Sequence, residues 1–142
     1  MTSICKNIEI ILGPMFSGKS SELLRRTNRY KAIGMNILLV NHEIDTRTED
    51  FVKTHNNSKE KAVKLNKLMD LFNKEEFIKA DVVGIDEAQF FEDIVEFVEK
   101  AEHYDKSYIF AGLDGSFKRK PIGKILEIIP YCNSVVKLNA LD

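Results

Sequence analysis

The chain has 142 residues, which suits one domain with a single core, and 44% of them are hydrophobic. Its formal net charge of −1 excludes a global attraction to nucleic acid or to an anionic membrane, and no apolar run approaches the roughly 20 residues of a membrane span. The amino terminus lacks the layout of a signal peptide, and two cysteines are too few for a disulfide framework. We therefore expect a cytoplasmic globular protein that binds neither nucleic acid nor membranes.

The first part of the chain alternates strand, helix and strand. Residues 7–12 (NIEIIL) form a β-branched run of strand length. A helix is expected over 19–32, with Gly34 where a carboxyl-terminal cap belongs. A second strand is expected at 36–40, and the polar, poorly periodic stretch 42–61 predicts a long loop.

The second part continues the alternation. We expect strands at 81–86, 108–111 and 134–138. Helices are expected at 65–72, at 91–98, where the pattern is amphipathic, and at 121–129, where the helix is short. Strands that alternate with helices indicate an α/β fold, in which a parallel sheet is covered by helices on both faces. Such sheets bind ligands at the carboxyl ends of their strands.

A phosphate-binding pattern lies between the first strand and the first helix. The sequence GPMFSGKS matches G-x-x-x-x-G-K-[ST]. Its glycines allow a tight turn that brings backbone N–H groups to phosphate oxygens, which also face the positive end of the helix. The lysine is a cation for the outer phosphates, and the serine hydroxyl can ligate Mg²⁺. A plain glycine-rich turn is the alternative to nucleotide binding by Gly13, Pro14, Met15, Phe16, Ser17, Gly18, Lys19 and Ser20.

A phosphate loop of this kind needs an acid at the end of a neighbouring strand to hold the metal. Asp86 and Glu87 lie at the end of the strand expected over 81–86. Asp86 would hold Mg²⁺ together with Ser20, and Glu87 would point at the reacting centre. The alternative is a strand that ends in two solvated acids, which is common.

Bulky apolar residues accompany these polar groups. Met15 and Phe16 lie inside the loop, and two aromatic residues follow the acids in DEAQFF, residues 86–91. Residues 113–122 (LDGSFKRKPI) interleave apolar, basic and turn-forming side chains after the fourth strand. Together these segments indicate a flat apolar slot beside the phosphates, which suits the stacking of a nucleobase.

At this point the sequence resembles a known family. GPMFSGKSSELLRR, DTR at 45–47, DEAQFF, LDGSFKRKPIG and SVVKL occur in the order seen in thymidine kinases of the cellular and poxvirus type, from about residue 8 to 138. The resemblance implies a parallel P-loop NTPase sheet of RecA-like type. It also implies transfer of the γ-phosphate of ATP to the 5′-hydroxyl of thymidine or deoxyuridine, a nucleoside salvage step for DNA synthesis, by a homo-tetramer.

The resemblance further implies roles for single residues. Glu87 matches the family's general base, which accepts the proton of the attacking hydroxyl, and Asp86 matches the acid on the metal. Cofactor-binding positions outside the phosphate loop are matched by Asp45, Thr46, Arg47 and Gln89. Positions that line the thymine pocket are matched by Met15, Phe90, Leu113, Phe117 and Ile122. The alternative for the apolar residues is ordinary core packing, and for the charged residues Asp45 and Arg47 it is a position in a solvated loop.

The sequence departs from the family pattern in two places. Ile122 stands where the family has an aromatic residue beside the base, which predicts loss of a stacking contact worth about 0.5–1.5 kcal/mol. In the family a zinc-holding segment with four cysteines and a lasso loop over thymidine follow the last strand, whereas this sequence ends there at Asp142. We expect no zinc, because Cys5 and Cys132 match no zinc spacing, and weaker phosphorylation without the lasso. Surface positions are expected for His42, His55 and His103.

Two other functions stay open from the sequence. A nucleotide-binding remnant or fragment would hold ATP, or assemble with full-length subunits, without efficient catalysis. A GTPase or ATPase switch is suggested by residues 139–142 (NALD), which resemble N-K-x-D but lack its lysine. Nucleoside-stimulated release of ADP would favour the kinase, whereas nucleotide hydrolysis without a nucleoside would favour the switch.

Overall fold

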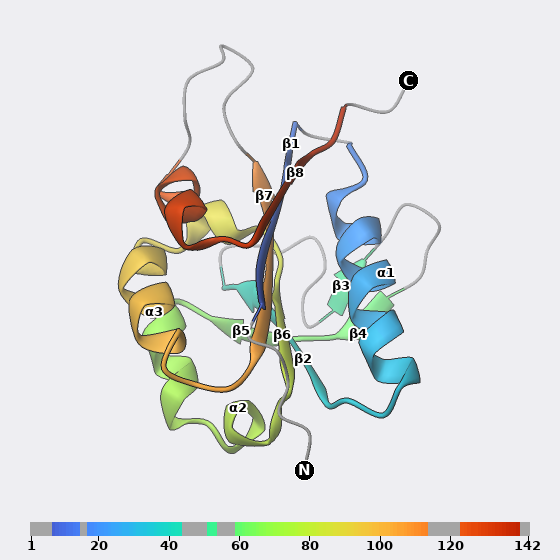
Figure 1. Ribbon diagram of the computed structural model, residues 1–142, viewed down its shortest axis with the longest axis vertical. Coiled ribbons are helices and arrows are strands. Elements are labelled where there is room, and N and C mark those ends of the chain that lie inside the picture. The colour runs from blue at the N-terminus through green and yellow to red at the C-terminus, as the bar shows by residue number, and fades with distance from the viewer. Residues whose placement is uncertain (1–6, 15–16, 44–50, 54–58, 114–122, 140–142) are drawn as a thin grey trace.

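The centre of the molecule is a parallel β-sheet. The computed structural model describes residues 7–14, 17–43, 51–53, 59–113 and 123–139. The sheet has six strands in the order β5-β2-β6-β7-β1-β8, and every neighbouring pair is parallel (Figure 1). In chain order the six strands are β1 (Asn7–Gly13), β2 (Ile37–His42), β5 (Val63–Leu65), β6 (Val82–Ile85), β7 (Ser107–Leu113) and β8 (Ser134–Lys137). The predicted parallel α/β fold is confirmed.

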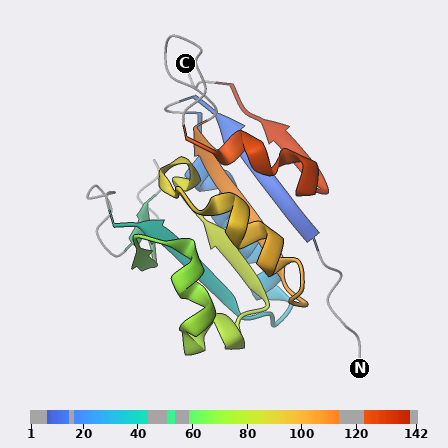
Figure 2. The ribbon, with the colours of Figure 1, turned by 90° about the vertical axis from the view of Figure 1, so that its left-hand side faces the viewer.

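Helices cover both faces of this sheet, as Figures 1 and 2 show. One face carries α1 (Lys19–Ala32), whose bounds are those predicted. The opposite face carries α3 (Ile94–Ala101) and the short helices at its sides, which are η1 (Leu68–Asn73), α2 (Glu75–Lys79) and η3 (Ile125–Tyr131). None of the helices in the described part of the chain has the length and hydropathy needed to cross a membrane.

The two faces of the sheet are formed by alternate residues of each strand. Along β1, Ile8, Ile10 and Leu12 belong to the core under α3, whereas Ile11 packs in the core under α1. This alternation follows from the two-residue period of a strand. Gly84 in β6 allows α1 to lie close, because a Cβ atom there would be 3.2 Å from side-chain carbons of both Leu23 and Thr27. The sheet therefore fixes the position of α1, which begins at the phosphate loop.

Several predicted boundaries were wrong. The stretch predicted as a long loop contains an antiparallel hairpin of β3 (Phe51–Lys53) and β4 (Lys59–Lys61). The helix expected over 65–72 is a 3₁₀ helix that begins at Leu68. The strand before it, β5, was not predicted because it is too short to show the two-residue period. The helix expected from residue 91 begins at Ile94, after a separate turn, η2 (Ala88–Phe90). The short helix before the last strand is also 3₁₀ and includes Pro130 instead of ending before it.

Candidate functional site

The predicted site residues that the structure describes lie at the carboxyl edge of the sheet. Gly13, the last residue of β1, pairs with Leu113, the last residue of β7. The strand beside β7 is β6, which ends at Ile85, and Asp86 and Glu87 come directly after it. At the start of α1, Gly18 has φ 85°, a left-handed conformation that glycine adopts without a steric penalty. The loop, the two acids and the end of β7 therefore meet at one edge.

The phosphate loop is closed by its own lysine. The Nζ atom of Lys19 donates to the backbone oxygen of Pro14 at 2.7 Å and to Oγ of Ser17 at 3.4 Å. The turn depends on Gly13, because a Cβ atom there would lie 2.5 Å from Oγ of Ser17. Lys19 is only 8% exposed, and a buried ammonium is stabilised by anions that replace its lost hydration. The loop is therefore suited to anionic oxygens.

The first turn of α1 is joined to the end of β6 by a side-chain hydrogen bond. The Ser20 hydroxyl donates to Oδ2 of Asp86 at 2.8 Å, and Oδ1 of Asp86 accepts the backbone N–H of Glu87 at 3.0 Å. The sequence predicted these acids on a strand next to β1, and this was wrong, because β7 lies between β1 and β6. Ser20 nevertheless reaches Asp86 because α1 packs across β1, β7 and β6. A hydroxyl and a carboxylate at this spacing are the hard oxygen ligands that Mg²⁺ prefers.

Glu87 has an unusual backbone conformation. Its φ of 51° and ψ of 44° are left-handed, and Glu87 is the one non-glycine residue with positive φ among the described residues. Such a conformation costs about 1–2 kcal/mol for a residue with a Cβ atom. The side chain is held by Gln89, whose Nε2 atom donates to Oε2 of Glu87 at 2.7 Å. Strain of this kind gathers at functional sites, and it marks Glu87 as a candidate.

Aromatic rings border the acids on the β2 side. The ring of His42 lies 4.8 Å from that of Phe91, edge to face, and 5.9 Å from that of Phe90. Phe90 is 37% exposed, whereas His42 is 8% exposed, so the predicted surface position of His42 was wrong. The sequence missed His42 because the strand predicted to end at residue 40 continues through it. Of these three rings only that of Phe90 is exposed, three residues after Glu87 in the chain.

Comparison with known proteins agrees with this geometry. The family model described as thymidine kinase matches residues 6–141. The chain is 47% identical to cytosolic thymidine kinase of Gallus gallus and 45% identical to that of Homo sapiens, over 94% of this chain in both cases. It is also 45% identical to thymidine kinase of Myxoma virus (strain Uriarra) over 94% of this chain. The chain belongs to the thymidine kinase family.

The matches cover different shares of these relatives. The chain spans just over half of the cytosolic enzymes, 59% of the chicken protein and 56% of the human one. It spans 74% of the Myxoma virus protein. The matched part includes the phosphate loop, Asp86 and Glu87, because the family match runs from residue 6 to residue 141.

Some positions that the thymidine kinase resemblance assigns to the site fall outside the described residues. These are Met15, Phe16, Asp45, Thr46, Arg47, Phe117 and Ile122, and their roles stay predictions. Among the described residues, Leu113 is half-buried at the end of β7, and Gln89 is 4% exposed beside Glu87. Within the same described residues, no group of three or more His, Cys, Asp or Glu side chains could hold a metal ion.

The orientation of α1 in this thymidine kinase family member is fixed by charged groups that sequence reasoning missed. Arg26 contacts Oε2 of Glu22 at 2.7 Å and Oε1 of Glu9, on β1, at 2.5 Å. Arg25 also donates a hydrogen bond to Glu22. This bond, together with the one from Arg26, lowers the pKa of Glu22 to about 2, although burial of the carboxyl group acts in the opposite direction. The spacing of Glu22 and Arg26, four residues apart on a helix, was the signal available in the sequence.

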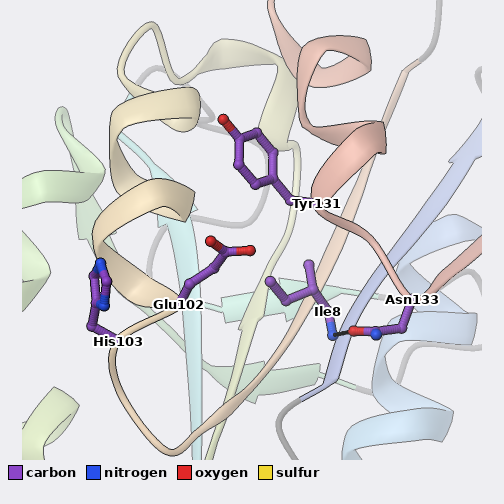
Figure 3. A pocket seen from close by; sticks show the side chains of 5 residues that line it. All are labelled: Ile8, Glu102, His103, Tyr131 and Asn133. Carbon is purple, nitrogen blue, oxygen red and sulfur yellow. Dashed lines mark hydrogen bonds between the residues drawn. The ribbon is translucent and has the colours of Figure 1, made fainter.

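A separate hollow lies away from this edge. It has a volume of about 430 Å³ and is lined by Ile8, Glu102, His103, Tyr131 and Asn133 (Figure 3). The side chain of Asn133 accepts the backbone N–H of Ile8 at 2.7 Å, and the Tyr131 hydroxyl donates to Glu99 at 2.8 Å. The first bond joins β1 to the residue before β8, and the second joins η3 to α3. The hollow contains none of the predicted site residues.

Proposed function

We propose that the protein transfers the γ-phosphate of ATP to the 5′-hydroxyl of thymidine or deoxyuridine, with Mg²⁺ as cofactor. The observation that carries the proposal is the contact of Ser20 with Asp86 at 2.8 Å, with Glu87 as the next residue. This contact joins the glycine-lysine loop to the acid that we propose for Mg²⁺, with the candidate base next to it. Membership of the thymidine kinase family supports the choice of a nucleoside as acceptor.

The phosphate loop would bind the triphosphate. Lys19 lies under the loop, within reach of Pro14 and Ser17, so it can turn to the β- and γ-phosphates when they replace these partners. The N–H groups at the start of α1 face the same anions. Ser20 and Asp86 would hold Mg²⁺, which when bound neutralises charge on the transferring phosphate.

Glu87 would act as the general base. The 5′-oxygen of the nucleoside attacks the γ-phosphorus, the bond between that phosphorus and the bridging oxygen breaks, and ADP leaves. The 5′-hydroxyl proton passes to the Glu87 carboxylate, which is half-buried beside Asp86. Gln89 donates a hydrogen bond to Oε2 of Glu87 at 2.7 Å, which gives the carboxylate a defined direction.

The nucleoside would lie against the apolar side of this edge. Phe90 is exposed in the turn after the acids, and Leu113 ends β7, where its N–H binds Gln89; with Met15, Phe117 and Ile122 these residues are proposed to form the pocket. Asp45, Thr46 and Arg47 are proposed to lie near the phosphates, where a guanidinium would offset developing charge. We further propose a cytoplasmic homo-tetramer made of single P-loop kinase domains, in keeping with relatives named cytosolic thymidine kinase.

A panel of acceptors tests the proposal. The purified protein is incubated with ATP and Mg²⁺ and either thymidine, deoxyuridine, deoxycytidine or 5′-deoxythymidine, which lacks the accepting hydroxyl. The proposal predicts release of ADP with thymidine and deoxyuridine and none with 5′-deoxythymidine. Release of ADP that does not depend on a nucleoside would instead indicate a nucleotide-hydrolysing switch.

A further inference from the structure

Gln89 is the only glutamine in the sequence, and both ends of its side-chain amide are used. Its Nε2 atom donates to Oε2 of Glu87 at 2.7 Å, and its Oε1 atom accepts the backbone N–H of Leu113 at 3.0 Å. The two partners fix the orientation of the amide, because a carboxylate needs a donor and a backbone N–H needs an acceptor. The Glu87 carboxylate is thereby attached to the end of β7.

The space around Gln89 is shaped for this side chain. A Cβ atom at Gly112 would lie 2.6 Å from Oε1 of Gln89, and one at Gly123 would lie 2.3 Å from its backbone oxygen. Two glycines therefore pack directly on the side chain and the backbone of Gln89, which is 4% exposed. With this packing the amide has little freedom to leave its two partners.

We propose that Gln89 is a positioning residue, which holds the Glu87 carboxylate in the direction needed to accept a proton. The proposal rests on the proposed function, in which Glu87 is the base. It assigns Gln89 a role distinct from the cofactor contact expected from the family resemblance. The left-handed backbone of Glu87 does not by itself fix the direction of its side chain, and the hydrogen bond from Gln89 helps to set it.

Two substitutions separate positioning from packing. Gln89→Met keeps the length of the side chain and removes both hydrogen bonds. Gln89→Glu keeps an acceptor for the N–H of Leu113 but replaces the donor to Glu87 with a second carboxylate, which repels it. The exposed neighbour Glu92 provides the control Glu92→Met. For each variant, kcat for nucleoside phosphorylation and the Kd of ADP with Mg²⁺ are measured.

The proposal predicts a fall in kcat on the order of 10–100-fold for both Gln89 variants, since a misplaced catalytic group costs about this much. The Kd of ADP with Mg²⁺ stays within about two-fold of the wild type, and Glu92→Met matches the wild type in both quantities. If Gln89 only anchors Leu113, Gln89→Glu keeps its kcat, and that result would overturn the proposal. A parallel loss of ADP affinity in both Gln89 variants would overturn it as well.

Crystal structures of the wild type and of Gln89→Met test the positioning role of Gln89 even if the proposed function fails. If the wild type phosphorylates no nucleoside, the proposed function fails, and crystal structures of the wild type and Gln89→Met then test the positioning alone. The proposal predicts that the Glu87 carboxylate moves by about 1 Å or more in Gln89→Met. An unmoved carboxylate would contradict it.

Discussion

The Ser20 hydroxyl donates a 2.8 Å hydrogen bond to Oδ2 of Asp86, a residue 66 positions later in the chain. This bond links the first turn of α1 to the residue after β6, although β7 lies between β6 and β1, the strand that leads into α1. It therefore sets the spacing between the phosphate loop and the two acids.

Asp86→Asn is expected to uncouple nucleotide binding from Mg²⁺. The amide keeps an acceptor for Ser20 but loses the charge that favours a divalent cation, and a metal contribution of several kcal/mol predicts a fall in kcat on the order of 100-fold or more. Calorimetry with ADP checks this, with and without Mg²⁺. The affinity gained from Mg²⁺ in the wild type should disappear in Asp86→Asn, while binding of ADP alone persists. If Mg²⁺ raised the ADP affinity of Asp86→Asn as much as that of the wild type, Mg²⁺ would not be bound by Asp86.

Lys19→Met is expected to weaken ATP binding by tenfold or more, since hydrogen bonds to charged groups contribute about 1.5–3 kcal/mol. The side chain is buried against Pro14 and Ser17, so methionine, of similar length, should preserve folding. Lys79→Met is the matched control, because Lys79 is 70% exposed and pairs with Glu75 on α2. Equal ATP affinities for the two variants would show that Lys19 does not bind the phosphates.

The left-handed conformation of Glu87 predicts a difference between two inactive variants. Glu87→Gly and Glu87→Ala both remove the carboxylate and its bond to Gln89, so both should lose phosphorylation. Only alanine keeps the steric penalty of φ 51°, and Glu87→Gly should therefore be more stable by about 1 kcal/mol. Urea unfolding measures this difference. Equal free energies of unfolding would mean that the backbone relaxes at this position.

The lowered pKa of Glu22 predicts how stability depends on pH. Because the pKa falls from 4.5 to about 2 on folding, the carboxylate stabilises the protein fully above about pH 4.5, and this contribution is lost as the pH falls toward 2. We expect Glu22→Gln to be less stable than the wild type by about 2 kcal/mol at pH 6, which allows for solvent screening of the exposed Arg25. The difference should shrink toward pH 2. A difference independent of pH would exclude this cause.

The parts of the site that could be predicted from sequence are local ones. The turn between β1 and α1 and the bounds of α1 were predicted correctly because a glycine-lysine pattern, a helix start and a glycine cap lie within 22 residues of one another, from Gly13 to Gly34. Asp86 and Glu87 were found because a β-branched run precedes them. Each of these signals is carried by neighbouring residues and does not depend on tertiary packing.

The parts that failed depend on tertiary contacts. The order of strands decides that β7 separates β1 from β6, and no local pattern reports it. The short strand β5 pairs through only three positions with β2, which gives no readable period. The role proposed for Gln89 depends on its contact with the N–H of Leu113, 24 residues away, which appears only once β7 and η2 are placed together.

The most direct measurement of the central claim is a single-turnover assay of the wild type and Glu87→Gln with saturating ATP, Mg²⁺ and thymidine. The account predicts formation of thymidine 5′-monophosphate by the wild type. It predicts a rate lower by a factor on the order of 10²–10⁴ in Glu87→Gln, with the affinity for ADP and Mg²⁺ retained. Equal rates for the two proteins, or ADP formation by the wild type without any monophosphate, would contradict the account.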